Sequence, residues 1–172
     1  SIDAVEAAVA SNEFDAIALY KAMDAQRVAR GLSWREVAAQ IWNQSADLNR
    51  ERHDHPISPS TLTGIAKRRD CTCQHALFVL RWLDRTPESF LRIVPVFENG
   101  CDALPSVGPG HRLRWNLHAL YDALNGRRQA RQLSWPEVAG ELRCTEHQLT
   151  GLRTAKYAIR MALAMQIVQW LE

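Results

Sequence analysis

Residues 19–41 read LYKAMDAQRVARGLSWREVAAQI, and residues 120–142 read LYDALNGRRQARQLSWPEVAGEL. Aligned at this offset of 101 residues, 12 of the 23 pairs are identical. The similarity resumes at an offset of 87, where SPSTLTGI (58–65) faces TEHQLTGL (145–152). A two-copy repeat with a separate stretch of chain between the copies predicts two domains rather than a solenoid.

Each copy predicts a series of short helices. The sequences SWRE (33–36) and SWPE (134–137) are capping boxes, in which the serine hydroxyl accepts from the third helical amide and the glutamate reaches back to the serine amide. The third helices also have start signals. Ser58 precedes a proline, which is tolerated at the first helical position, and Thr145 forms a capping box with Gln148. We therefore expect an all-α protein.

The later helices and the domain boundaries follow from the same alignment. Trp-Leu at 82–83 faces Trp-Leu at 170–171 at an offset of 88. The first copy carries about fourteen additional hydrophilic residues, which extend its second helix or form a surface connection. The predicted segments are an acidic N-terminal helix or arm (1–16), a first domain (17–92) with the insert (43–56), a linker rich in proline and glycine (93–112) and a second domain (113–172). The predicted fourth helices cover residues 73–84 and 158–171. A short fifth helix is predicted over residues 87–91.

The charge of the chain is unevenly distributed. The net charge is only +2 for 172 residues, but residues 19–92 carry 12 Lys and Arg against 8 Asp and Glu, and residues 111–172 carry 9 against 5. Two basic blocks favour a polyanionic partner, although two helical domains with ordinary solvated surfaces would show the same distribution. A hydrophobic fraction of 47% argues against disorder, and no apolar run is long enough to cross a membrane. Without a secretion signal, the four cysteines are expected to be reduced thiols of a cytoplasmic protein.

The pattern RxxRGLSWREVA, then ISPSTLTGI, an apolar fourth helix and PESFL resembles the Cro/XRE-type helix-turn-helix family of phage repressors and bacterial transcriptional regulators. The resemblance covers residues 17–92 and, without the last helix, residues 113–171. It implies two tandem lambda-repressor-like domains, each of four to five short helices, whose third helix enters the major groove of double-stranded DNA. The implied function is sequence-specific DNA binding as a transcriptional repressor at the bacterial nucleoid, with two different third helices that read adjacent half-sites.

Carried onto this chain, the resemblance implies base-reading residues on the third helices and phosphate contacts around them. The base-reading candidates are Ser60, Thr63, Gly64 and Lys67 in the first copy and Glu146, His147, Thr150, Gly151 and Arg153 in the second. The phosphate candidates are Ser33, Arg35, Lys67, Arg68 and Arg69 in the first copy and Arg128, Ser134, Thr145, Thr154 and Lys156 in the second.

Several of these residues also have a purely structural interpretation. Gly64 and Gly151 permit either close approach to DNA or packing against another helix. The basic run 67–69 is typical of a solvated helix end, but its place directly after a third helix favours DNA. Trp34 and Trp135 are expected to pack within their domains rather than to stack on bases. The expected core positions of the third helices are Leu62, Ile65, Leu149 and Leu152.

Other classes of function have weaker support. Cys71, Cys73 and His75 are zinc-type ligands, but their spacing matches no established zinc pattern, so neither a metal nor another cofactor is expected. The chain has no phosphate-binding glycine loop, nucleophile elbow or zinc-protease motif, which argues against an enzyme. The alternative function is a helix-turn-helix adaptor without DNA specificity of its own. The partner would then be a second copy of the chain or a regulatory protein.

The relative orientation of the two predicted domains does not follow from the repeat. A pseudo-twofold axis and a head-to-tail arrangement are both compatible with the alignment, and both would allow half-sites about 34 Å apart on one face of a duplex.

Overall fold

The computed structural model describes residues 12–93, 103–154 and 158–172 of the chain. Within these ranges the regular structure consists of α-helices and two short 3-10 helices, and the only β-pairing is a pair of isolated bridges. The expected all-α class is therefore confirmed. No helix in the described part of the chain is long and apolar enough to span a bilayer.

The N-terminal repeat, residues 14–91, packs its helices around a buried central helix. Its elements are α2 (Ala16–Ala29), α3 (Trp34–Asn43), α4 (Ala46–Glu51), α5 (Pro59–Arg68), α6 (Cys73–Leu83) and the 3-10 helix η1 (Pro87–Phe90). Helix α6 has seven buried residues and contacts both α2 and α3, which also hold α5 between them. An antiparallel bridge between Phe14 and Leu91 joins the two ends of this repeat.

The C-terminal repeat, residues 117–171, has the same order of helices without the insert or the fifth helix. Its elements are α7 (Leu117–Ala130), α8 (Trp135–Leu142), α9 (Glu146–Thr150), the 3-10 helix η2 (Gly151–Arg153) and α10 (Met161–Trp170). As in the first repeat, the third element packs between the first two helices of its repeat. The alignment of the sequence copies therefore corresponds to an alignment of helices in space.

In the C-terminal repeat the third helix opens after Thr145 as predicted, and the predicted start of the fourth helix is wrong. The third helix is α-helical for five residues and becomes a 3-10 helix at Gly151, a residue that costs a helix about 1 kcal/mol relative to alanine. The fourth helix begins at Met161 rather than at Ala158. It starts late because Arg160 is extended and the backbone on either side of it is paired with the other repeat.

The capping boxes form in both repeats as the sequence predicts. The amide of Glu36 donates to Ser33 Oγ over 3.1 Å, and the amide of Ser33 donates to the Glu36 carboxylate over 3.0 Å. The corresponding distances between Ser134 and Glu137 are 3.3 and 3.4 Å. A side-chain cap of this kind contributes about 1 kcal/mol to the stability of the helix.

A tyrosine, a tryptophan and an arginine form the same stack in each repeat. Tyr20 stacks on Trp34 with ring centroids 5.6 Å apart, and the Arg27 guanidinium lies 4.8 Å from the centre of the Trp34 ring. In the C-terminal repeat the rings of Tyr121 and Trp135 are 5.7 Å apart, and Arg128 lies 4.7 Å from the Trp135 ring centre. Both tryptophans therefore have the structural role expected of them.

The third helices turn their predicted apolar positions into the core. Leu62 and Leu149 have no exposed surface, and Ile65 and Leu152 are 1% and 3% exposed. Burying a side chain of this size stabilises the fold by about 1.5–3 kcal/mol. This burial fixes the opposite side of each third helix toward solvent.

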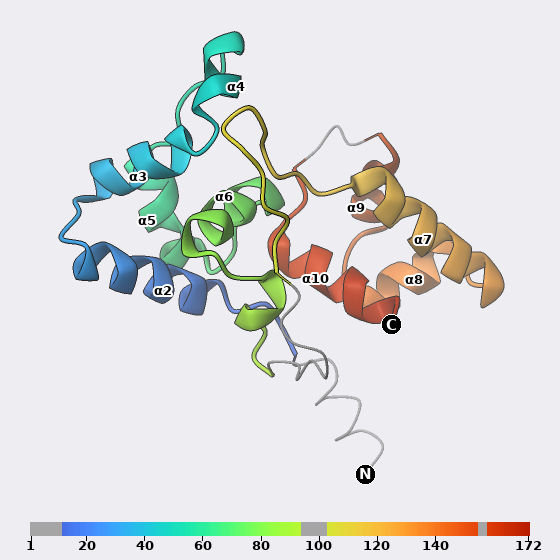
Figure 1. Cartoon of the computed structure of the whole chain (residues 1–172). Helices are drawn as coiled ribbons and strands as arrows, with labels where there is room; N and C mark the ends of the chain where they lie inside the picture. Colours follow the sequence, from blue (N-terminus) through green and yellow to red (C-terminus); the bar gives the residue numbers. More distant parts are fainter. Residues whose placement is uncertain (1–11, 94–102, 155–157) are drawn as a thin grey trace.

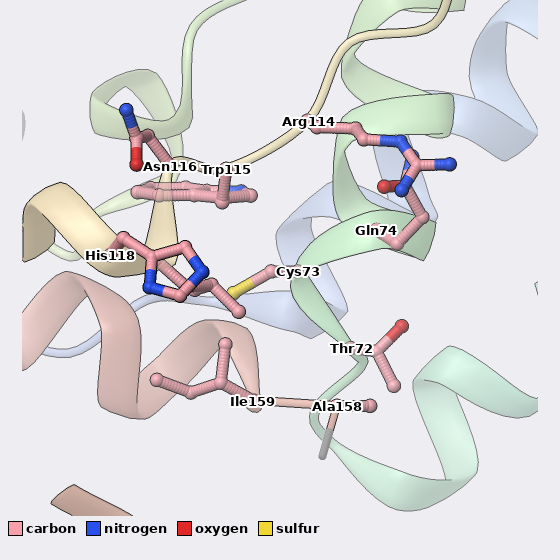
Figure 2. A pocket seen from close by; sticks show the side chains of 10 residues that line it. Thr72, Cys73, Gln74, Arg114, Trp115, Asn116, His118, Ala158 and Ile159 are labelled. Atoms are coloured by element: carbon pink, nitrogen blue, oxygen red, sulfur yellow. The ribbon is translucent and has the colours of Figure 1, made fainter. Parts of the chain in front are cut away.

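The two repeats meet at the starts of their fourth helices. Thr72 and Arg160 form an antiparallel bridge, in which the Cys73 amide donates to the Ile159 carbonyl and the Met161 amide donates to the Cys71 carbonyl. Helices α6 and α10, which follow these segments, lie side by side at the centre of the molecule (Figure 1). Figure 2 shows the junction from a hollow of about 250 Å³ beside it, with residues 72–73 of one repeat near residues 158–159 of the other.

The described part of the linker, residues 103–112, has no helix but is held in place by α6. The guanidinium of Arg81 donates to the carbonyl oxygens of Val107, Gly108 and His111 over 3.0 to 3.2 Å. The linker thus packs on the N-terminal repeat before it enters α7.

The insert also binds the linker, through contacts separate from those of Arg81. It is neither an extension of α3 nor wholly a loop, because α4 is a separate helix. The amides of Asp47 and Leu48, in the first turn of α4, both donate to the Pro109 carbonyl, so the linker caps this helix. The side chain of Arg112 is 8% exposed, pairs with Asp54 over 3.2 Å and lies 5.1 Å from the ring centre of Trp42. These contacts give the extra residues of the first copy a structural role.

Candidate nucleic-acid interface

The first candidate surface is the solvent side of α5. Its N-terminus is capped by Ser58, whose hydroxyl accepts from the Thr61 amide over 3.2 Å. Ser60 and Lys67 are exposed, and Thr63 and Gly64 are half-buried. These positions are spaced three and four residues apart, so they share one side of the helix, opposite the buried leucine and isoleucine. The structure therefore brings the four base-reading candidates of the first repeat onto a single surface.

Gly64 makes room for a cation on this surface. The three atoms nearest to a Cβ built at Gly64 all belong to the guanidinium of Arg68, and such a Cβ would overlap it. Arg68 also donates to the Thr61 carbonyl over 3.4 Å, so its side chain lies back along the helix. The nearest neighbour of this glycine is thus an arginine of the same helix rather than another helix.

Positive charge is concentrated at the end of α5. Lys67, Arg68 and Arg69 are all exposed, and the first turn of α5 contains no acidic residue. Arg69 ends the helix in the left-handed conformation with φ of 56°. Three cations beside an exposed polar helix face form a surface that attracts a phosphate backbone.

At the N-termini of the second helices, the serine groups expected to meet phosphate already have hydrogen-bond partners within the chain. Arg35 is exposed at the start of α3, as a phosphate contact requires. The Ser33 amide and hydroxyl, however, are already bonded to Glu36, and these bonds lower the pKa of the Glu36 carboxyl. Ser134 is engaged by Glu137 in the same way. Arg35 is therefore better placed than either serine to meet a phosphate.

The second candidate surface is formed by α9 and η2. Glu146, His147 and Arg153 are exposed, and Thr150 and Gly151 are half-buried. The hydroxyl of Thr150 donates to the Glu146 carbonyl over 3.2 Å. The five candidates lie on a shorter and partly 3-10 element that carries an acidic residue in its first turn. The two surfaces therefore present different side chains to a partner.

The phosphate candidates of the C-terminal repeat lie in different environments. Thr145 caps α9 with its hydroxyl, which accepts from the Gln148 amide over 3.2 Å. Thr154 is exposed and its hydroxyl donates to the Gly151 carbonyl. Lys156 lies outside the described residues.

Arg128 is bonded within its own repeat. Its Nε and Nη2 atoms donate to the Asn125 side chain over 3.1 and 2.9 Å, and its Nη1 atom donates to the Leu133 carbonyl over 2.9 Å. Arg27 makes the equivalent bonds to Asp24 and to the Leu32 carbonyl. This geometry favours a brace of the turn after the first helix, and the phosphate contact of Arg128 stays a prediction.

Arg160, which the sequence did not single out, is a further cation beside the α9 and η2 surface. It is exposed and lines a hollow of about 280 Å³ together with His147 and Gly151. Burial lowers the pKa of His75, and the positive charges of Arg68 and Arg160 lower it further. Arginines from both repeats therefore act on one side chain. The alignment gives no signal for this role, because Arg160 faces Thr72 in the first copy.

The zinc-type ligands Cys71 and Cys73 belong to the core at the junction of the repeats. Cys71 and Cys73 are each 4% exposed. Burial, with the nearby negative charge of Asp70, raises the pKa of each thiol to about 12. Both thiols are therefore protonated at neutral pH within this core. Among the residues that the structure describes, no group of three or more His, Cys, Asp or Glu side chains is arranged to hold a metal ion.

No protein-family model matches the chain, and neither a curated protein nor a solved structure matches it. The features of the chain that bear on function are its internal repeat and the two exposed third helices.

Proposed function

We propose that the chain is a sequence-specific double-stranded DNA-binding protein with two tandem helix-turn-helix domains of the Cro/XRE type. In this proposal it acts in the bacterial cytoplasm, at the nucleoid, as a transcriptional regulator and more specifically a repressor. The observation that carries the proposal is the exposed face of α5, with Ser60, Thr63, Gly64 and Lys67, beside the basic run 67–69. The α9 and η2 element presents a second set of polar residues to solvent in the other half of the chain, with a different charge pattern.

The chemistry of the two surfaces supports base recognition. A lysine or an arginine donates to the guanine edge, and a carboxylate accepts from the cytosine amine. Lys67 is suited to guanine on the first surface, and Arg153 and Glu146 are suited to guanine and cytosine on the second. Because the two sets differ, we expect the two domains to prefer different half-sites.

The proposal is tested by selecting bound fragments from genomic DNA and measuring their affinity by gel shift across a salt series. Binding to phosphates releases counterions, so the affinity should fall by about 10³–10⁵ between about 50 and 200 mM salt if 6–10 phosphates are contacted. The double variant Lys67→Ala, Arg68→Ala should bind all sequences more weakly, with a salt slope lower by about 1 for each phosphate that is no longer neutralised.

The matched control is the double variant Arg50→Ala, Arg92→Ala, which removes two exposed arginines away from α5 and changes the net charge equally. It should retain nearly the affinity and the salt slope of the unmodified chain. If no fragment is retained at any salt concentration, the proposal fails and the adaptor function becomes the better account. If both double variants behave alike, α5 is not the DNA-binding element.

A further inference from the structure

The bridge between the repeats joins two equivalent residues. Thr72 directly precedes α6 and Arg160 directly precedes α10. The offset between them is 88 residues, the same offset that aligns Trp82 with Trp170. An antiparallel bridge between a residue and its own equivalent has a local twofold axis that passes between the two residues, because the contact is isologous.

The two hydrogen bonds of the bridge are exchanged by the same axis. The Cys73 amide donates to the Ile159 carbonyl over 2.9 Å, and the Met161 amide donates to the Cys71 carbonyl over 2.8 Å. At the offset of 88 residues, Cys73 corresponds to Met161 and Cys71 corresponds to Ile159. Each bond therefore maps onto the other. A head-to-tail arrangement would instead pair unlike positions of the two copies.

The packing around the bridge follows the axis as well. Helices α6 and α10 contact each other, and the other helices of the two repeats extend to opposite sides of this central pair (Figure 1). Equivalent positions on the two helices are buried alike, as Ala76 and Ala164 or Val79 and Ile167 show. The shared core thus extends through the axis.

Some contacts at the junction are made by one repeat and have no counterpart in the other, so the two repeats are not identical there. Asp70 accepts from the Ala162 amide over 3.3 Å, so a carboxylate of the first repeat caps the fourth helix of the second. The position equivalent to Asp70 is Ala158, which has no carboxylate. The linker is clamped by the N-terminal repeat through its insert and α6. The twofold axis therefore relates the backbones of the two repeats, whereas their side chains and their contacts with the linker differ.

We infer that the chain is a pseudo-dimer within one polypeptide, and that its DNA site consists of two unequal half-sites in inverted orientation, bound by a single chain. This inference rests on the proposed DNA-binding function. The same axis that relates α6 to α10 relates α5 to the α9 and η2 element, so the two reading elements meet a duplex in opposite directions. The site is then an imperfect inverted repeat, since the two elements carry different side chains.

The test uses the unmodified chain and synthetic duplexes made from a selected fragment. Point changes across the fragment first define its two half-sites. One half-site is then reversed in place, at constant spacing, so that the inverted arrangement becomes a direct one. A third duplex keeps only the stronger half-site. Affinity and stoichiometry are measured for all three.

We expect one chain per inverted duplex, and an affinity for the direct duplex that falls to that of the single half-site. Because the second domain then no longer engages its half-site, the affinity should fall by a factor on the order of 100 or more. Equal or tighter binding of the direct duplex would overturn the inference while leaving the DNA-binding function intact. Two chains on each inverted duplex would also overturn it. Failure to bind any duplex would instead remove the proposed function itself.

Discussion

The two repeats share a scaffold but expose different third helices. Both have the serine capping box and the stack of tyrosine, tryptophan and arginine at nearly equal distances. In contrast, α5 is an unbroken helix of ten residues with a basic end, and α9 is a helix of five residues with an acidic start. The residues that fix the fold are alike in the two repeats, and the residues that face solvent differ. Under the proposed function, this difference predicts that the two repeats prefer different base sequences.

The first test of the comparison concerns the buried side of the third helices. Leu62 and Leu149 are equivalent and have no exposed surface, so Leu62→Ala and Leu149→Ala should each destabilise the chain by about 2–5 kcal/mol. Urea denaturation followed by circular dichroism measures both values. The control Val28→Ala, at a position 62% exposed, should change stability by less than about 0.5 kcal/mol. A destabilisation confined to one of the two leucine variants would break the equivalence of the repeats.

The second test concerns the clamp formed by the insert of the first repeat. Arg112 pairs with Asp54, donates to Asn49 and lies against Trp42, so Arg112→Ala should lower the free energy of unfolding by about 1–3 kcal/mol. Arg114 is exposed two residues further on and provides the control. Arg114→Ala should be nearly neutral. Equal effects of the two variants would show that the linker is not held by the insert.

The third test separates bracing from phosphate binding. Arg27→Ala and Arg128→Ala should each cost about 1–2 kcal/mol of stability, because each removes a ring contact and a bond to the turn carbonyl. If the arginines only brace their turns, both variants retain DNA affinity at temperatures where they are folded. If Arg128 also contacts a phosphate, only Arg128→Ala weakens binding and flattens its salt dependence.

The smallest effect at neutral pH comes from the thiols at the junction. Cys71 and Cys73 keep their protons in the folded chain up to a pKa of about 12, against 9.0 for an ordinary thiol. Between these values the unfolded chain loses protons that the folded chain retains, so stability falls as the pH rises through this window and is unaffected below it. The double variant Cys71→Ala, Cys73→Ala should show a shallower decline of stability above pH 9.0 in denaturation experiments. Parallel curves for the two proteins would contradict this assignment.

Much of the fold could be predicted because its signals are local. Capping boxes, the proline after Ser58 and the buried positions of Leu62 and Leu149 depend on residues three or four apart, and all of them form as expected. The repeat itself then predicts that the same helices occur twice. The exposed candidates on α5 and α9 follow from the same periodicity.

The junction could not be predicted because it has no local signal. Cys73 and Ile159 are bonded through their backbones, and nothing in their side chains indicates that contact. The late start of α10 follows from the same pairing. The internal bonds of Arg128 were missed for a related reason, since an arginine near a basic cluster looks alike whether it braces a turn or meets a phosphate.

The most direct test of the account is a hydroxyl-radical footprint of the unmodified chain on a selected fragment. At a ratio of one chain per duplex, we expect two protected patches on one face of the DNA, about 34 Å apart, which is the spacing of successive major grooves on that face. A single protected patch at this ratio, or a second patch that appears only when a second chain binds, would contradict the claim that both repeats engage one duplex.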